Sequence, residues 1–172
     1  MVAMKNIILF ISAVSATAIP KRTSTIILTD IGIIDRSVNA LTIAVNDYEG
    51  EVFQLLTLND AVGALDTAIK VAGTDANITS PLSSADSSLV YTATLNLVSP
   101  IQQSLAAVVA KKAEFAAAGL TTTVTGNVAT LKKDTDTLSQ NIYNIASSDV
   151  KPKLVVVQSE VDSAFTAAQA AL

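Results

Sequence analysis

The sequence predicts an all-α protein, a five-helix antiparallel bundle with a kinked third helix. Apolar residues recur at alternating spacings of four and three along several segments, which is the pattern of one face of an amphipathic helix. Turn-forming residues separate these segments, and short links favour antiparallel neighbours. No segment alternates apolar and polar residues for more than a few positions, as a half-buried strand would.

The first two predicted helices end at Gly50 and at a loop over residues 77–81. Glycine commonly follows the last turn of a helix, and Pro81 breaks the second helix. The apolar face of the first helix consists of Ile27, Ile31, Ile34, Val38, Leu41, Val45 and Tyr48. The apolar face of the second consists of Leu55, Leu58, Val62, Leu65, Ile69, Ala72 and Ala76.

The third predicted helix runs from about Leu82 to Ala118, and Ser83 is one of the residues able to cap its start. Pro100 lies in its middle. Proline lacks a backbone N–H and clashes with the preceding turn, so a kink or a break is expected near Val98–Ser99. The buried face is predicted to consist of Leu95, Val98, Ile101, Leu105, Val108 and Phe115.

The fourth predicted helix begins after residues 121–123, and the fifth begins after residues 147–149, with Pro152 in its first turn. The face of the fourth consists of Val124, Val128, Leu131, Thr135, Leu138, Ile142 and Ile145. The face of the fifth consists of Leu154, Val157, Val161, Ala164, Ala168 and Ala171. Repeats with a spacing near 3.5 favour helices that cross at about 20°.

Residues 1–18 are predicted to be a secretory signal peptide, and residues 23–172 a single helical domain. One lysine, a short apolar run and the small-x-small sequence Ala16-Thr17-Ala18 are typical of such a peptide. The apolar run is shorter than the about 20 residues that span a bilayer. The dibasic pair Lys21–Arg22 would allow further trimming, so that residues 1–22 are removed. The mature protein is therefore expected outside the cell.

The composition argues against catalysis. The chain has no Cys and no His, which excludes disulfides, the usual zinc, iron–sulfur and haem sites, and Ser-His-Asp or Cys-His nucleophiles. Asp134 and Asp136 are two residues apart and so point to different sides of a helix. We therefore expect neither an enzyme nor a metal or other cofactor.

The charge of the chain bears on its partners. Without residues 1–22, eight basic residues remain against 15 acidic ones, and they form no basic patch. An acidic chain of this kind is not expected to bind nucleic acid or anionic membranes. No later run of 18 apolar residues appears, so no transmembrane anchor and no GPI-type tail are expected. Asn77-Ile78-Thr79 is the single sequon for N-glycosylation, and Asn77 is a candidate site in the predicted surface loop.

The helix faces are made of Val, Ala, Ile, Leu and Thr, and aromatic residues are only 4% of the chain. Helices faced with small and medium side chains pack fully only if they approach closely. Helices that are held apart instead enclose a long, dry cavity. Composition and periodicity leave both alternatives open.

Four sequence features together resemble a known family. They are Asp30 to Gly50 with Ile34, Asp35, Val38, Leu41, Ala44, Val45 and Tyr48 at fixed spacing; Ala64-Leu65-x-x-Ala68-Ile69; Leu82-Ser83-x-x-Asp86; and Val98-x-Pro100-Ile101. In this order they are similar to the fungal hydrophobic-surface-binding proteins and cell-wall galactomannoproteins. The resemblance implies a secreted or cell-wall five-helix bundle. Members bind long-chain fatty acids in an apolar cavity or coat hydrophobic surfaces.

The resemblance leads to one main functional expectation. The protein should bind a long-chain fatty acid or a similar amphiphilic lipid in an apolar cavity. One alternative is a surface-active protein that adsorbs to hydrophobic surfaces and recruits secreted enzymes. Another is a structural wall mannoprotein with a packed core. The single unit lacks the Ser/Thr-rich stalk of larger wall mannoproteins, which argues against permanent wall attachment.

The ligand-binding residues are predicted from the helix faces and the resemblance together. The tail should lie along the bundle axis, lined by Val38, Leu41, Val45, Leu65, Ile69, Val98, Leu105, Leu131 and Leu138. A carboxylate head group needs hydrogen-bond donors, and the candidates are hydroxyls because His is absent and Arg is scarce. These hydroxyls are Ser104 and Thr135 on the helix faces, and Ser147 and Ser163 near the bundle end.

Overall fold

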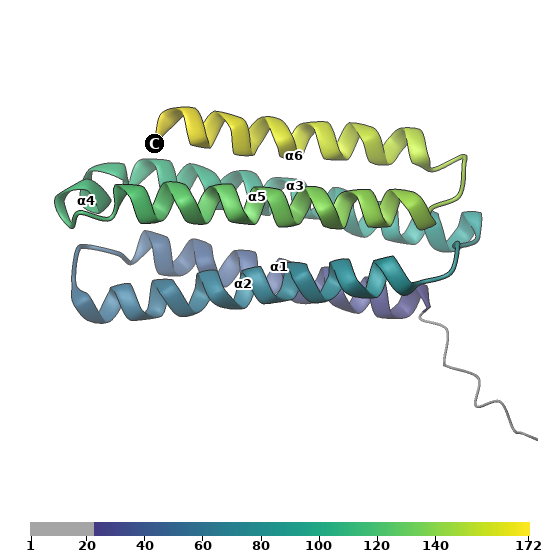
Figure 1. The fold of residues 1–172 in the computed structure, drawn as a ribbon, viewed down its shortest axis with the longest axis horizontal. Coiled ribbons are helices and arrows are strands. Elements are labelled where there is room, and N and C mark those ends of the chain that lie inside the picture. The colour runs from purple at the N-terminus through teal and green to yellow at the C-terminus, as the bar shows by residue number, and fades with distance from the viewer. Residues whose placement is uncertain (1–22) are drawn as a thin grey trace, which may run out of the picture.

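The computed structural model describes residues 23–172, and the predicted signal peptide lies outside this range. The described chain forms six α-helices, so the prediction of five was wrong. They are α1 (Ser24–Asn46), α2 (Val52–Ile78), α3 (Ser84–Ala110), α4 (Lys112–Ala117), α5 (Thr121–Ile145) and α6 (Lys151–Ala171). Figure 1 shows the five long helices lying side by side along one axis, with α4 at one end between α3 and α5.

The five long helices form a closed ring. α1 packs against α2 and α3, α2 packs against α5, α3 packs against α6, and α5 packs against α6. Among residues 23–172, the backbone of α1 does not closely approach that of α5 or α6, and the backbone of α3 does not closely approach that of α5. A ring of five helices has an axis that no helix occupies, so side chains from all five must fill it. This arrangement determines where the interior site lies.

The predicted faces of α1 and α5 are the ones that the bundle buries. In α1 the buried residues include Ile27, Ile34, Val38 and Leu41, at the helical spacing seen in the sequence. Gly50 has φ +98°, a conformation that a side chain disfavours, and it lies in the turn after α1. The predicted helical periodicity is therefore confirmed.

The third predicted helix breaks at Lys111 and not near Val98–Ser99. α3 continues through Pro100, whose missing N–H would have bonded to the carbonyl of Asn96. Asn96 is exposed, so water can hydrate that carbonyl. The bend at Pro100 stays a prediction. Lys111 has φ −91° and ψ 13°, outside the helical range, and α4 starts after it.

Tertiary contacts explain the break at Lys111. Its ammonium donates to the backbone carbonyl of Tyr48 at 2.7 Å, and the ring of Phe115 packs on the Tyr48 ring. Gly119, with φ +72°, then ends α4, while the N–H of Leu120 bonds to the carbonyl of Phe115 at 2.8 Å. The chain thus turns back into α5, and α4 covers one end of the bundle.

Two local predictions were wrong. Leu95 is 40% exposed, and Leu97 is buried in its place. Leu97 lies seven residues, or two helical turns, after the buried Val90, so both share one face.

Asn77 lies in the last turn of α2 and not in a loop, because the helix continues to Ile78. Asn77 is exposed.

Hydrogen bonds fasten the other end of the bundle, where the α2–α3 and α5–α6 links meet. The N–H of Leu82 donates to the carbonyl of Ile145 at 2.8 Å. The N–H of Ser147 donates to the hydroxyl of Ser87 at 2.9 Å, and the Ser84 hydroxyl donates to Asp149. Each bond joins segments that are about 60 residues apart in sequence. This end is therefore closed by polar contacts, whereas the α4 end is closed by an aromatic pair.

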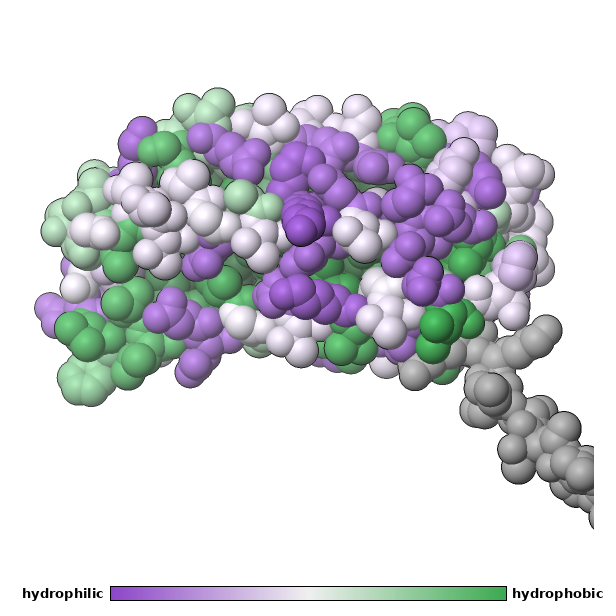
Figure 2. Space-filling model, in the orientation of Figure 1, coloured by the Kyte–Doolittle hydropathy of each residue, from purple (hydrophilic) through white to green (hydrophobic). Residues whose placement is uncertain are grey.

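No helix between residues 23 and 172 combines the length and apolarity that a bilayer span requires. The visible surface is mixed, with hydrophilic residues over much of the bundle and hydrophobic residues gathered at the end that holds the α1–α2 turn (Figure 2).

Candidate functional site

A central cavity lies on the ring axis. Its volume is about 70 Å³, and all five long helices contribute to its wall. Its lining is aliphatic except for Phe165, Ser104 and Thr135. The residues that line it are Ile34, Val38, Leu41, Leu65, Ile69, Leu97, Ile101, Ser104, Leu105, Val108, Val128, Leu131, Thr135, Leu138 and Phe165.

Two further cavities lie on either side of it. The first, of about 50 Å³, is at the α4 end and shares four lining residues with the central cavity, namely Leu41, Val108, Val128 and Leu131. The second, of about 60 Å³, shares Leu97, Ile101, Thr135 and Leu138 with it. The shared residues make the three cavities one apolar row along the axis.

The cavities are small. A cavity needs about 10–15 Å³ to hold one water molecule, whereas pockets for drug-sized ligands have about 300–1,000 Å³. Each cavity of the row thus has room for a few water molecules only. Residues 23–172 do not enclose one long open cavity along this axis, so a long ligand has to displace side chains between the helices.

The structure brings together most of the predicted site residues. Nine of them line the central cavity: Val38, Leu41, Leu65, Ile69, Ser104, Leu105, Leu131, Thr135 and Leu138. Val45 lines the cavity at the α4 end. Val98 is buried in α3 but lines none of the three cavities.

Two of the predicted hydroxyls lie away from the row. Ser163 is exposed on α6 and donates to the carbonyl of Ser159 at 2.7 Å. Ser147 lies in the α5–α6 link, at the end fastened by hydrogen bonds. Neither lines one of the three cavities, because Ser163 is on an exposed face of α6 and Ser147 lies beyond the end of α5.

Sequence reasoning missed several cavity residues. Leu97 and Phe165 line the central cavity and are buried. Helical spacing could have predicted both residues. Leu97 lies two helical turns after Val90, and Phe165 lies four residues after Val161. No such signal pointed to the polar residues at the α4 end, because the prediction followed apolar spacing and a polar residue interrupts it. These residues are Asn59, Thr123 and Asn127.

The two hydroxyls in the central cavity differ from others in the same helices. Thr125, Thr130 and Thr137 of α5 donate to the carbonyl four residues earlier, at 2.9–3.0 Å. No such bond is found for Thr135, or for Ser104 of α3, within residues 23–172. Ser104 is only 5% exposed. Both hydroxyls are thus free to donate to a group in the cavity.

Charged side chains lie outside the row, since none of the residues from 23 to 172 that line its cavities is charged. One charged cluster joins α5 to α6. Lys132 contacts Asp136 at 2.9 Å and Asp162 at 3.0 Å. The hydrogen bond from Lys132 to Asp136 raises the pKa of Lys132, whereas burial raises the pKa of Asp136. This cluster thus connects α5 and α6 without entering the cavities.

These features define an all-helical bundle protein with an uncharged, apolar interior site. The chain belongs to the hydrophobic surface binding protein A family, whose sequence profile matches residues 24–144. No curated protein sequence matches the chain.

Solved structures with the same fold include Afmp4p in complex with palmitic acid. That protein is 34% identical, with a TM-score of 0.84 over 86% of this chain and 98% of its own. Ligand-binding domain 2 of the Penicillium marneffei MP1 protein, complexed with multiple arachidonic acids, is 17% identical, with a TM-score of 0.80 over 88% of this chain and 97% of its own. Ligand-binding domain 1 of MP1, complexed with arachidonic acids, is 16% identical, with a TM-score of 0.78 over 83% of this chain and 93% of its own. The family resemblance inferred from the sequence is confirmed.

Proposed function

We propose that this protein binds the tail of a long-chain fatty acid between its five long helices. The observation that carries the proposal is the row of apolar cavities on the ring axis, lined by no charged residue between positions 23 and 172. The likeness to Afmp4p in complex with palmitic acid supports it, because that protein is 34% identical over most of both chains.

Burial of the tail favours binding, whereas widening of the cavities opposes it. Burying a sixteen-carbon tail contributes about 10 kcal/mol before other terms, at about 0.8 kcal/mol per methylene. Ordering of the ligand and separation of the side chains reduce this gain. Medium-sized aliphatic side chains such as Leu41, Ile69 and Leu105 can change rotamer without exposing a polar group. The tail would occupy the space that these side chains now share.

Native mass spectrometry with palmitic acid tests the proposal. The expected result is a complex of one chain with at least one fatty acid, which survives at collision energies that remove lipid bound to the surface. A spectrum with only the free chain at saturating palmitic acid contradicts it.

We also propose that the protein is secreted, that its role is binding and not catalysis, and that Asn77 carries a glycan. The sequence of residues 1–18 supports secretion, and the exposure of Asn77 supports glycosylation. N-terminal sequencing and mass measurement of material from the culture medium test both. A chain that still begins at residue 1 contradicts removal of a signal peptide.

A second function, adsorption to an uncharged hydrophobic surface, is favoured by an apolar patch at the start of α2. This patch consists of Val52, Phe53 and Leu56, which are 71%, 82% and 58% exposed. It lies where hydrophobic residues gather at the end with the α1–α2 turn (Figure 2). A solvent-exposed apolar cluster of this kind commonly marks an interaction site.

The charges around this patch indicate what it binds. Asp47, Glu49, Glu51 and Asp60 flank it in sequence, and no basic residue occurs from 47 to 69. Carboxylates beside the patch disfavour an anionic membrane and also a second copy of the same patch. A neutral hydrophobic surface carries neither penalty.

A further inference from the structure

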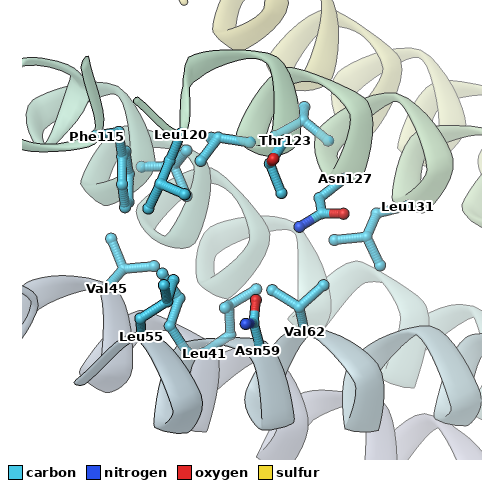
Figure 3. A pocket seen from close by; sticks show the side chains of 14 residues that line it. Leu41, Val45, Leu55, Asn59, Val62, Phe115, Leu120, Thr123, Asn127 and Leu131 are labelled. Carbon is cyan, nitrogen blue, oxygen red and sulfur yellow. The ribbon is translucent and has the colours of Figure 1, made fainter. Parts of the chain in front are cut away.

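The cavity at the α4 end has a polar mouth. Of its fourteen lining residues, eleven are apolar, and the other three are Asn59, Thr123 and Asn127. Figure 3 shows Asn59 rising from α2 toward α5, with Thr123 and Asn127 on the opposite side of the gap. Asn59 and Thr123 are exposed and Asn127 is half-buried, so these groups lie between solvent and the apolar interior.

The donors of these three side chains are not used elsewhere. Some amides of the bundle do have partners, since Asn39 donates to the carbonyl of Asp35 at 2.9 Å and Asn141 donates to that of Gly73 at 3.0 Å. Within residues 23–172, no hydrogen bond is found for the side chains of Asn59, Thr123 or Asn127. Each amide offers two N–H donors and the hydroxyl offers one.

A path for a lipid tail leads inward from this mouth. Leu41, Val108, Val128 and Leu131 line both this cavity and the central one. On α5, the distance from Asn127 to Leu138 at the far side of the central cavity is about 17 Å, at 1.5 Å per residue. A tail that starts at the mouth would therefore pass along the ring axis.

We propose that the mouth between α2 and α5 holds the carboxylate of the bound fatty acid, with hydrogen bonds from Asn59, Thr123 and Asn127. This inference rests on the proposed function. An anion is less costly here than beside Ser104, because Asn59 and Thr123 are exposed to water whereas Ser104 is only 5% exposed. The start of α5 at Thr121, close to Thr123, adds a weak positive potential.

The test compares an acid with its uncharged ester. Affinities of palmitic acid and methyl palmitate are measured by displacement of a fluorescent fatty acid, for the wild type and for Asn59→Leu with Asn127→Leu. The variant should bind the acid about tenfold more weakly, since two hydrogen bonds to an anion are lost. The affinity for the ester should change less than twofold.

Two further variants complete the design. The control, Asn96→Leu with Asn144→Leu, changes two exposed amides that do not line this mouth and should leave both affinities unchanged. Asn127→Asp keeps the shape and polarity of the side chain, so it tests the mouth even if the leucine variant does not fold. Its carboxylate should weaken binding of the acid and not of the ester.

The outcomes separate the two proposals. If the wild type binds neither the acid nor the ester, the proposed function fails and the mouth site fails with it. If the wild type binds both, and the mouth variants bind the acid as tightly as the wild type does, only the mouth site is overturned. Weaker acid binding by Ser104→Ala with Thr135→Val, but not by the mouth variants, would place the carboxylate in the central cavity.

Discussion

The ring of Phe115 in α4 stacks on the ring of Tyr48 in the turn after α1, with centroids 5.1 Å apart and planes inclined by 21°. Tyr48 is 1% exposed and Phe115 is 2% exposed. The backbone carbonyl of Tyr48 also accepts a hydrogen bond from Lys111. Because Phe115 lines the cavity at the α4 end, this pair closes the apolar row beside the proposed mouth.

Replacing Phe115 with Ala should therefore destabilise the protein strongly. Loss of a buried aromatic side chain typically costs about 3–5 kcal/mol. The free energy of unfolding from urea titration measures the effect. Tyr48→Phe is the control, since it keeps the stacked rings and should change stability much less. Equal losses in the two variants would contradict a role for the stacking.

Filling the row should abolish binding. Leu41 lines two of the three cavities, so Leu41→Trp places a larger side chain where the tail would lie. We expect the affinity for a fluorescent fatty acid to fall at least tenfold, while the helical circular dichroism spectrum is retained. Leu89→Trp is the matched control, because Leu89 is 57% exposed on α3. A folded Leu41→Trp protein with wild-type affinity would mean that the tail lies elsewhere.

The apolar patch can be tested without disturbing the interior. Val52→Ser with Phe53→Ser should reduce adsorption to polystyrene beads several-fold, since each side chain contributes about 1.5–3 kcal/mol when it is fully buried. Val155→Ser with Val156→Ser removes two other exposed apolar residues, which are 51% and 57% exposed on α6, and should change adsorption little. Adsorption that falls equally in both variants would show a general effect of surface hydrophobicity. Loss of a dimer in sedimentation would show that the patch binds a second copy.

Acid should weaken the contact between the starts of α1 and α3. Hydrogen bonds from Ser24 and then Ser83 lower the pKa of Asp86 below its ordinary value of 3.8. A carboxylate whose pKa is lowered by folding adds stability above its unfolded pKa, and this stability is lost as the pH falls through the folded value. The melting temperature of the wild type should thus fall more than that of Asp86→Asn when the pH drops below about 4. Equal falls in the melting temperatures of the two proteins would exclude Asp86 as a contributor to this loss of stability.

Pro100→Ala should alter fatty-acid binding by the row of cavities more than it alters the stability of the fold. Alanine restores the N–H donor for the carbonyl of Asn96 and removes the ring clash, so thermal stability should stay similar or rise. If a bend at Pro100 positions Leu97 and Ile101, a straighter helix should bind fatty acid more weakly. Titration of both proteins with a fluorescent fatty acid measures this. Unchanged affinity would argue against a role for the bend.

Much of the interior site could be predicted because it follows from helical periodicity. Leu41, Ile69 and Leu131 face the axis since each lies on the apolar stripe of its helix. The mouth could not be predicted in this way. Asn59 and Asn127 are far apart in sequence and interrupt apolar faces, so only the packing of α2 on α5 brings them to one cavity.

The all-helical class, the buried faces of the long helices and the uncharged character of the interior follow from the amino-acid sequence alone. These properties depend on residue type and on spacing within a segment, both of which can be read locally. The closed ring of five helices, the break at Lys111, the size of the cavities and the position of the mouth arise only when the helices pack together. Those depend on contacts between distant residues, such as Lys111 with Tyr48, and the spacing within one helix does not specify its partner.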